Sequence, residues 1–472
     1  APANLPMPAR NFVLLVVATI GCIAAWYAQR RDERGQRVNE VLTLIDAAYI
    51  ERVDGEAIVA AALDGVVATL DENSTIVRGD GQHELEAALN QQFGGVGLEL
   101  AIDERTGELS VAMPLPDGPA WEAGIVAGDR IKAIDGVTTV GVPLPEAVAR
   151  LRGRPGETVT LTVQPAVGAA PARDVRLVRE LVQVESVQGD RRRVDGTWEW
   201  WLEGEPGVAY VRITGFGERT AAELDRVLDE VAAGPAGAGV PHAPRGLVID
   251  LRGNPGGLVT AAVDVCDRFL DDGVIVSTCG RREAPGGAGD ESPTDVRRAT
   301  PGAVVPGLPI AILVDDLTAS AAEIVAACLQ DHRRATIVGG RTFGKGTVQS
   351  ILPLTGGGLL KLTTAEYLRP DGRTIDRSHE DADGAGWGVV PDDGYALAPA
   401  SDSLDRLDLW RKLRDAHPAV APPGRAMPKP RAIDEVLARA IDAFPVVSPP
   451  RTDLRGEEET PRDADDASPS GV

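Results

Sequence analysis

The chain has 472 residues, enough for two or three domains with a sizeable core, because domains usually hold about 100 to 200 residues. Its formal net charge is −23, from 48 basic and 71 acidic side chains. This charge argues against a general nucleic-acid binder, because phosphate affinity depends on clustered Lys and Arg, and it favours protein or small-molecule partners.

Residues 1–36 contain an uncharged apolar run, FVLLVVATIGCIAAWYA, at positions 12–28. Its length is at the short limit of a membrane-spanning helix, about 17 to 25 residues, and the small residues needed for signal cleavage are poorly placed. We therefore expect a retained anchor in the cell membrane, with the part of the chain that follows it extracytoplasmic, in the periplasm. The arginines that follow the run oppose export, because positive charge normally stays in the cytoplasm, and this conflict stays open.

Two regions of different character follow the apolar run. Residues 37–92 place apolar side chains at helical spacing, for example Val41, Leu44 and Ala48, which predicts an amphipathic helical arm. Residues 93–165 change to short β runs, turn dipeptides and one short helix, which predicts a compact β-rich domain. The segment PAVGAAPA after them predicts a hairpin turn or a linker.

Residues 166–400 alternate β runs with helical patterns, from GVAYVRITGF and TAAELDRVLDEVAA through LPIAILVDD to ATIVGG and VQSILPL. This alternation predicts an α/β fold with a mixed or largely parallel sheet and flanking helices, whose active groups gather at strand ends. Residues 401–448 predict a C-terminal helical region, and the acidic residues 449–472 a disordered tail.

Ser320 follows the apolar run IAILVD and begins a helical pattern. With Glu323 it fits the S-x-x-E capping box, in which side chains satisfy free amides at a helix start. The same position also suits a nucleophile, because a strand-to-helix turn surrounds a hydroxyl with backbone donors for an oxyanion. The spacing alone leaves both interpretations open.

Lys345 lies between two glycines, and every charged residue from 332 to 364 is basic. A lysine acts as a base only when burial or cationic neighbours lower its pKa, and this setting permits that as well as a solvated loop lysine. Gln349 would lie about 13 Å away along a straight strand, so it can orient Lys345 only if Gly346 bends the chain.

Histidine offers a competing base for Ser320. His332 would lie about 18 Å of helical rise from the helix start, which predicts a structural or surface residue. His379, in a charged loop, stays open as the base of a Ser-His hydrolase of small esters. The cysteines lack metal-ligand spacing; buried thiols are favoured, and a Cys266–Cys279 bridge stays open.

The turn DLRGNPGG, residues 250–257, closes a strand with three glycines, which serves either as a tight turn or as an exposed row of amides. Its glycines lack the Lys-Ser/Thr ending of a phosphate-binding loop. After it come TASAAEIVAACLQDHRRATIVGGRTFGKGTVQ, TTAEYLRPDGRTID and GVVPD. This ordered series resembles the carboxy-terminal processing proteases, tail-specific serine peptidases of family S41.

The resemblance implies a protease core of ClpP/crotonase-like fold with a Ser/Lys dyad. Ser320 matches the family nucleophile, Lys345 its general base and Gln349 the residue that orients this lysine. The amides of Gly257 and Ala321 match the oxyanion hole. No metal or cofactor is implied. The family commonly has serine where Ala322 stands, and glycine or a small polar residue where Leu317 stands, so Leu317 puts the shape of the local turn in question.

Residues 93–165 resemble the PDZ domain of this family. The resemblance implies that the loop formed by Gly95, Val96, Gly97 and Leu98 holds a substrate's terminal carboxylate on its amides, with Val96 and Leu98 as an apolar wall. Arg152 is the candidate for the arginine that contacts the protease core in the active state. The implied partners are protein substrates with exposed apolar C-termini, the membrane through the N-terminal helix, and a second copy of the chain.

The sequence thus predicts a serine endopeptidase that recognises substrates through their C-terminal residues and works through an acyl-enzyme. The alternative is a catalytically silent, PDZ-bearing peptide-binding protein on the same scaffold. The presence of both Ser320 and Lys345 favours the enzyme.

Overall fold

The computed structural model describes residues 33–445, apart from 103–105, 116–117, 167–169, 235–243, 281–294, 380–385, 399–405, 408–409, 412–413 and 416–428. Two compact units make up this part of the chain. One unit contains the residues up to Glu86 together with Thr347–Ala365; the other contains Ala87–Gly346 and the residues from Glu366 onward. The expected anchor at 12–28 and the acidic tail at 449–472 lie outside the described residues.

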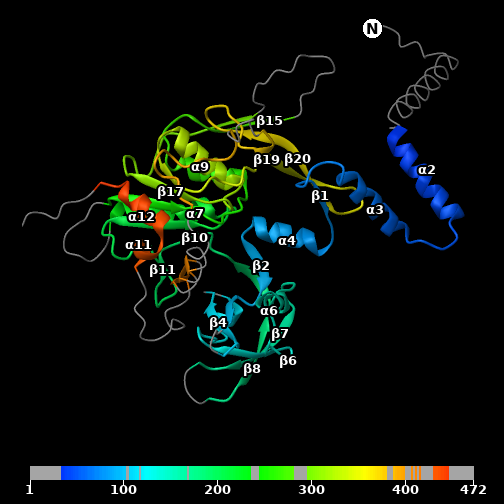
Figure 1. The fold of residues 1–472 in the computed structure, drawn as a ribbon. Helices are drawn as coiled ribbons and strands as arrows, with labels where there is room; N and C mark the ends of the chain where they lie inside the picture. The colour runs from blue at the N-terminus through cyan, green and yellow to red at the C-terminus, as the bar shows by residue number, and fades with distance from the viewer. Residues whose placement is uncertain are drawn as a thin grey trace, which may run out of the picture. The chain divides into compact units, whose positions relative to one another are not determined.

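The first unit contains the predicted helical arm, seen as the blue helices of Figure 1. Its helices are α2 (Glu33–Ala48), α3 (Gly55–Val67) and most of α4 (Asp80–Leu89). The strand β1 (Thr75–Val77) interrupts the helical pattern and pairs antiparallel with β20 (Leu359–Leu368), which also pairs with β19 (Thr347–Pro353). None of the helices in the described part of the chain is long and apolar enough to cross a membrane.

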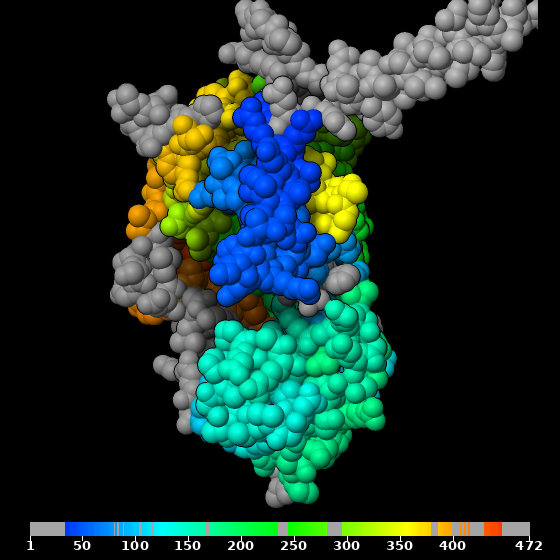
Figure 2. All heavy atoms as spheres, turned by 90° about the vertical axis from the view of Figure 1, so that its right-hand side faces the viewer, coloured from blue at the N-terminus to red at the C-terminus, as the bar shows by residue number. Residues whose placement is uncertain are grey.

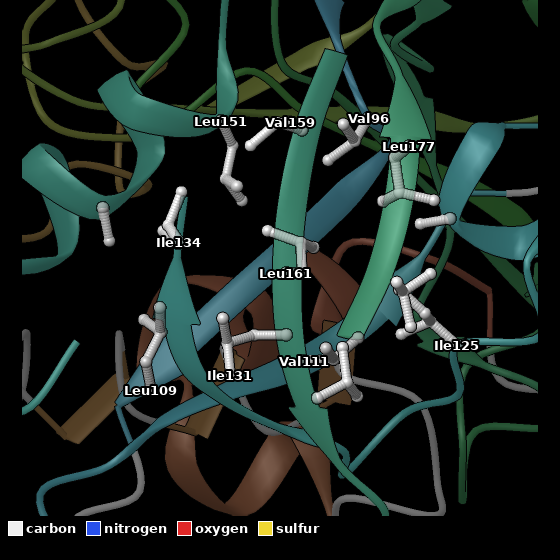
Figure 3. Packing of buried hydrophobic residues seen from close by; sticks show 14 residues of the cluster. Val96, Leu109, Val111, Ile125, Ile131, Ile134, Leu151, Val159, Leu161 and Leu177 are labelled. Atoms are coloured by element: carbon white, nitrogen blue, oxygen red, sulfur yellow. The ribbon is translucent and has the colours of Figure 1, made fainter. Parts of the chain in front are cut away.

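The β-rich domain has a six-stranded sheet with the order β3-β4-β5-β7-β8, and β6 pairs with β5. Its elements are β3 (Leu98–Ile102), β4 (Leu109–Pro114), α5 (Pro119–Glu122), β5 (Arg130–Ile134), β6 (Val137–Thr138), α6 (Leu144–Leu151), β7 (Thr158–Gln164) and β8 (Arg173–Val178). Its side chains form one apolar core, in which Val111, Ile131 and Leu161 point toward one another (Figure 3). Figure 2 shows the domain as a compact group of cyan to green spheres.

The β-rich domain extends beyond the expected end at residue 165. Strands β7 and β8 form a hairpin in which Thr158 pairs with Val178, so PAVGAAPA belongs to a hairpin connection rather than to a linker. The chain enters the domain through β2 (Gln92–Gly95) and leaves it through β9 (Glu180–Gln183), and these two strands pair with each other.

The α/β region is built on a second sheet with the order β10-β13-β14-β17-β18. Its strands are β10 (Val187–Gln188), β13 (Val208–Ile213), β14 (Gly246–Asp250), β17 (Ile310–Val314) and β18 (Thr336–Gly339). All pairs are parallel except that of β10 with β13, which confirms the predicted α/β class with a largely parallel sheet. Every residue of β14 and β17 is buried, as expected where both faces of a sheet are covered.

Helices cover this sheet. The helices α7 (Thr220–Ala233), α8 (Val259–Asp267) and α9 (Ala321–Asp331) pack side by side, while α12 (Glu435–Asp442) packs on β14, β17 and β18. Smaller elements are β11 (Arg191–Arg192), β12 (Trp198–Glu199), β15 (Val274–Gly280), β16 (Asp295–Arg298), α11 (Pro430–Ile433) and the 3-10 turn η1 (Arg377–His379). The parallel order places the carboxyl ends of β14 and β17 side by side, where the turns with Gly257 and Ser320 follow.

Candidate active site

The turn between β17 and α9 is built onto the turn that follows β14. Asp315 accepts hydrogen bonds from the amides of Gly253 (2.9 Å) and Leu317 (3.2 Å). The hydroxyl of Thr318 donates to the carbonyl of Leu251 at 2.9 Å. Leu317 itself is 62 % exposed, so its side chain faces outward and leaves the turn intact. The unusual leucine is therefore compatible with the local geometry.

Ser320 has a backbone conformation that residues with a side chain rarely adopt, with φ 57° and ψ −118°. Such a conformation costs about 1–3 kcal/mol and persists only where the surroundings enforce it. A glycine would adopt it without this cost, so the presence of serine makes its hydroxyl a candidate for a functional role. A sharp, strained strand-to-helix turn is the arrangement that exposes the nucleophile in many serine hydrolases.

Glu323 joins the Ser320 turn to the Lys345 loop. Its side chain is fully buried, and its Oε2 accepts hydrogen bonds from the amides of Ser320 and Lys345, each at 2.8 Å. The two amide nitrogens are therefore no farther apart than twice that distance. Its Oε1 accepts from the amide of Gly344 at 2.7 Å and from the hydroxyl of Thr342. Burial raises the pKa of Glu323, while these four donors act in the opposite direction.

The capping-box interpretation of Glu323 was right but incomplete. The hydrogen bond from the Ser320 amide to the Glu323 side chain is one half of the capping box that the S-x-x-E spacing predicts. The bonds from residues 342 to 345 join positions about twenty residues away, which local spacing does not indicate. Glu323 is thus a site residue whose larger role the sequence analysis missed.

The Lys345 loop is held by a second carboxylate on its other side. The amide of Gly346 donates to Oδ2 of Asp376 at 3.1 Å, and Asp376 is only 8 % exposed. A Cβ on Gly346 would lie 2.4 Å from the Asp376 amide nitrogen, so this position requires glycine. The basic sequence around Lys345 therefore does not keep carboxylates away, because the fold brings Glu323 and Asp376 to its neighbouring amides. Lys345 itself is half-buried.

The Gly257 turn lies against the start of α9, as the motif order predicts. A Cβ on Gly256 would lie 2.8 Å from Cβ of Ser320 and 3.0 Å from the amide nitrogen of Ala321. Gly257 has φ 143°, and a Cβ there would lie 2.0 Å from the carbonyl oxygen of Phe216. The fold thus brings together the two turns that carry the predicted oxyanion amides, although their role stays a prediction.

A buried ionic network holds Arg252, which belongs to the same turn as Gly256 and Gly257. Arg252 forms ion pairs with Asp250 (2.6 Å) and with Asp434 at the start of α12 (2.7 Å), and the hydroxyl of Tyr210 donates to Asp250 at 2.6 Å. Burial alone would raise the pKa of Asp250, but the Arg252 guanidinium holds it well below its usual range. The sequence analysis missed this network, because Asp434 lies far from the turn in sequence.

Gln349 lies on β19, in the other compact unit. Its side-chain amide donates to the hydroxyl of Thr347 at 2.8 Å and to that of Thr363 at 3.5 Å. Its role toward Lys345 stays a prediction.

The predicted carboxylate-binding loop connects β2 to β3, from Gly95 to Leu98. The carbonyl of Val96 accepts from the amide of Ala120 (3.0 Å), and that of Gly97 accepts from the amide of Leu115 (2.9 Å). Among the hydrogen bonds between described residues, none uses the amide of Val96 or of Gly97. These two amides are therefore the candidate hydrogen-bond donors of the loop toward a ligand.

Two details of the PDZ prediction change. Val96 is 1 % exposed and packs in the core with Val159 and Leu177 (Figure 3), so it supports the loop from inside and does not form an apolar wall; half-buried Leu98 can. The guanidinium of Arg152 lies 5.4 Å from the ring centre of Phe93 on β2. A contact of Arg152 with the protease core stays a prediction.

The remaining candidates are two histidines and the cysteines. His332 lies at the end of α9 and its Nε2 bonds the carbonyl of Val274 at 2.7 Å, which confirms a structural role. The backbone of His379 lies in η1, and its side chain is outside the described part of the structure. Cys266 and Cys279 are free thiols, so the bridge between them is wrong; the buried neighbour of Cys266 is Cys328.

Comparisons with known proteins show which family the chain resembles. Residues 207–393 match the model of peptidase family S41, and residues 111–165 match a PDZ domain model. A carboxy-terminal-processing protease of Bartonella bacilliformis is 34 % identical over 359 residues, covering 75 % of this chain and 74 % of that protein. A carboxyl-terminal-processing protease of Synechocystis sp. is 33 % identical, covering 70 % of each chain.

Among solved structures, a photosystem II D1 C-terminal processing protease matches with 26 % identity and a TM-score of 0.42, covering 81 % of this chain and 97 % of that one. The identity and coverage of the two sequence relatives decide the family. This chain belongs to the carboxy-terminal processing proteases of peptidase family S41.

Proposed function

We propose that this chain is a serine endopeptidase that binds the C-terminal residues of protein substrates in its PDZ domain and cleaves them with Ser320 and Lys345. One observation carries the proposal: a single oxygen of buried Glu323 accepts hydrogen bonds from the backbone amides of both residues, and Ser320 lies on a strained turn.

The proposed reaction runs through an acyl-enzyme. Neutral Lys345 accepts the hydroxyl proton of Ser320, and the serine oxygen attacks the scissile carbonyl carbon. The amides of Gly257 and Ala321 donate to the carbonyl oxygen as it becomes negative. A Cβ on Gly256 would lie 3.0 Å from the amide nitrogen of Ala321, and this closeness of the two turns supports the pairing. The lysine proton passes to the leaving amine, and water then hydrolyses the ester.

Substrate capture is assigned to the loop from Gly95 to Leu98. The support is the engagement of its carbonyl groups inside the domain, which leaves the amides of Val96 and Gly97 for a carboxylate. Leu98 begins β3 and gives an apolar contact for the last side chain of the peptide. A peptide that ends in an apolar residue with a free carboxylate is therefore the expected ligand.

Two further parts of the proposal rest on the sequence. We propose that residues 12–28 anchor the chain in the membrane and that its catalytic part is extracytoplasmic. We also propose a homodimer through the helical arm; exposed apolar side chains on α2 and α3, such as Val41, Leu44 and Val66, support it. Sedimentation of variants with these side chains changed to Ser should show whether dissociation follows.

The decisive experiment is turnover of a peptide substrate with an apolar C-terminus, followed by mass spectrometry. Ser320→Ala and Lys345→Ala should each abolish cleavage, with unchanged unfolding midpoints and unchanged peptide binding. Cleavage by Ser320→Ala would overturn the proposal. If the wild-type chain binds the peptide but never cleaves it, the silent-scaffold alternative is right; loss in His379→Ala with activity in Lys345→Ala would indicate the Ser-His alternative.

A further inference from the structure

The backbone around Gly257 is held by a short pairing with Phe216. The amide of Phe216 donates to the carbonyl of Gly256 at 2.9 Å, and the amide of Leu258 donates to the carbonyl of Phe216 at 2.7 Å. This parallel bridge uses the residues on either side of Gly257 and leaves the amide of Gly257 itself without an acceptor among the described residues. The direction of this amide therefore depends on where the backbone of Phe216 lies.

Thr220 closes the loop that carries Phe216. It is the first residue of α7 and is fully buried. Its Oγ1 accepts a hydrogen bond from the amide of Gly217 at 2.9 Å and lies 3.3 Å from the carbonyl oxygen of Gly215. The backbone amide of Thr220 donates to the carbonyl of Gly217 at 3.2 Å. One threonine thus contacts the neighbours of Phe216 on both sides.

The orientation of the Thr220 hydroxyl follows from its neighbour Ser186. Oγ of Ser186 lies 2.8 Å from Oγ1 of Thr220 and 2.9 Å from Oε2 of Glu223. This Oε2 also accepts from the amides of Ser186 (2.8 Å) and Val187 (3.2 Å), so it acts as an acceptor. Ser186 therefore donates its one proton to Glu223 and accepts the proton of Thr220. Oγ1 of Thr220 is thereby oriented as the acceptor for the amide of Gly217.

We propose that Thr220 is a positioning residue, whose hydroxyl holds the loop around Phe216 and thereby aims the amide of Gly257 at the oxyanion. This proposal rests on the proposed function of Ser320 and Gly257. Thr220 transfers no proton and touches no substrate. An oxyanion donor is effective only within about 2.7–3.1 Å of the place that the oxygen takes in the transition state. A loosened loop should therefore slow the chemical step and leave peptide capture unchanged.

The alternative is that Thr220 only stabilises the start of α7. Two substitutions separate the roles: Thr220→Val keeps the shape and removes the hydroxyl, whereas Thr220→Ser keeps the hydroxyl and removes the methyl group. Thr139 provides the matched control, because it is a buried threonine of the PDZ domain whose Oγ1 donates to the carbonyl of Ile131. Thr139→Val removes a buried hydroxyl that has no part in the proposed reaction.

The test measures peptide cleavage and inhibition by a peptide aldehyde, whose tetrahedral adduct with Ser320 carries an oxygen where the oxyanion would lie. For Thr220→Val we expect kcat to fall about 10-fold and aldehyde affinity to fall by the same factor, with KM unchanged, because a small displacement of an oxyanion donor is costly. Thr220→Ser and Thr139→Val should keep the wild-type kcat. Wild-type kcat in a folded Thr220→Val, or an equal loss in Thr220→Ser, would overturn the proposal.

A further variant covers the case in which Thr220→Val does not fold. Thr220→Cys differs from Thr220→Ser in one atom, and sulfur is the weaker hydrogen-bond acceptor. The kcat of Thr220→Cys should fall several-fold below that of Thr220→Ser; equal values would overturn the proposal. If Ser320→Ala still cleaves, the proposed function itself fails. If Ser320→Ala is inactive while the Thr220 variants cleave at the wild-type rate, Thr220 alone is wrongly assigned.

Discussion

The PDZ domain and the protease core fix their functional loops by different means. Apolar packing holds the PDZ loop, because buried Val96 joins a core of aliphatic side chains such as Leu161 and Leu177. Buried carboxylates hold the loops of the protease core, because Glu323 accepts hydrogen bonds from the amides of Ser320 and Lys345, and Asp376 accepts one from the amide of Gly346. Apolar packing tolerates small displacements, whereas each carboxylate oxygen fixes particular atoms. Binding should therefore degrade gradually under mutation, and catalysis abruptly.

The largest effect is expected for Glu323→Gln. The new amide nitrogen would face backbone N–H groups that need an acceptor, at a cost of about 1–3 kcal/mol for each buried donor left unpaired. Peptide cleavage should fall at least about 100-fold, since Ser320 and Lys345 lose their common anchor. Glu435→Gln, at an exposed position in the first turn of α12, is the control. Near-normal cleavage by Glu323→Gln would show that the shared oxygen does not organise the site.

Gly256→Ala should follow in size. Its Cβ would lie 2.8 Å from Cβ of Ser320, so the turn must shift, and kcat should fall about 100-fold because small displacements at a reacting centre are costly. Gly253→Ala is a matched control: Gly253 also has a positive φ, 68°, but a Cβ there meets nothing within 4 Å. Equal losses of kcat in the two variants would point to backbone strain instead of the contact with Ser320.

Leu161→Ala tests the apolar side of the comparison. Leu161 is fully buried in the PDZ core, so its truncation should lower the stability of this domain by about 2–5 kcal/mol. We expect a raised KM for peptides bound through their C-terminus, while a fluorophosphonate labels Ser320 at the wild-type rate. If the rate of Ser320 labelling falls by the same factor as peptide affinity, the packing of the PDZ domain also affects the loops of the protease core.

The contribution of Glu323 to the stability of the folded protein should fall as the pH rises. Because burial raises the pKa of this carboxyl in the folded protein above its ordinary value of 4.5, the folded state holds the extra proton in the window between the two values. Its contribution to stability is therefore complete below about 4.5 and is lost as the pH rises through the folded pKa. In urea unfolding, the free energy of unfolding of the wild type should fall across this window relative to that of Glu323→Gln. A wild-type value that rises with pH relative to the variant would contradict the assignment.

The smallest effect is expected for Leu317→Ser. The side chain is 62 % exposed and the turn is held by Asp315 and Thr318, so stability should change by no more than about 0.5 kcal/mol. Cleavage rates should stay within a few-fold of wild type. A large loss of cleavage would show that this leucine contacts the substrate.

Local patterns predicted most of the fold. The segment from Thr220 to Ala233 has a complete amphipathic period, and α7 has these bounds. The apolar run after residue 308 and the S-x-x-E pattern located β17 and the start of α9. Short edge strands such as β1 and β16 were missed, because three or four residues without alternation give no periodic signal.

The site was predicted only in part, for a physical reason. Motif order placed Ser320, Lys345 and the Gly257 turn in one site, and the parallel register of β14 and β17 brings the two turns together. The hydrogen bonds from the Lys345 amide to Glu323 and from the Gly346 amide to Asp376, and the ion pair of Arg252 with Asp434, join segments distant in sequence. No local period encodes such pairs, so only the folded chain reveals them.

The bonds of Glu323 end on backbone amides, and this has a consequence for how such proteins change over time. An amide is the same whichever side chain its residue carries, so these two hydrogen bonds do not use the side chains of Ser320 and Lys345. Ser320→Ala or Lys345→Ala should therefore remove the chemistry and keep these bonds. A lineage can therefore convert a protease of this design into a pure peptide receptor in one step, and such a receptor is one substitution away from regaining turnover.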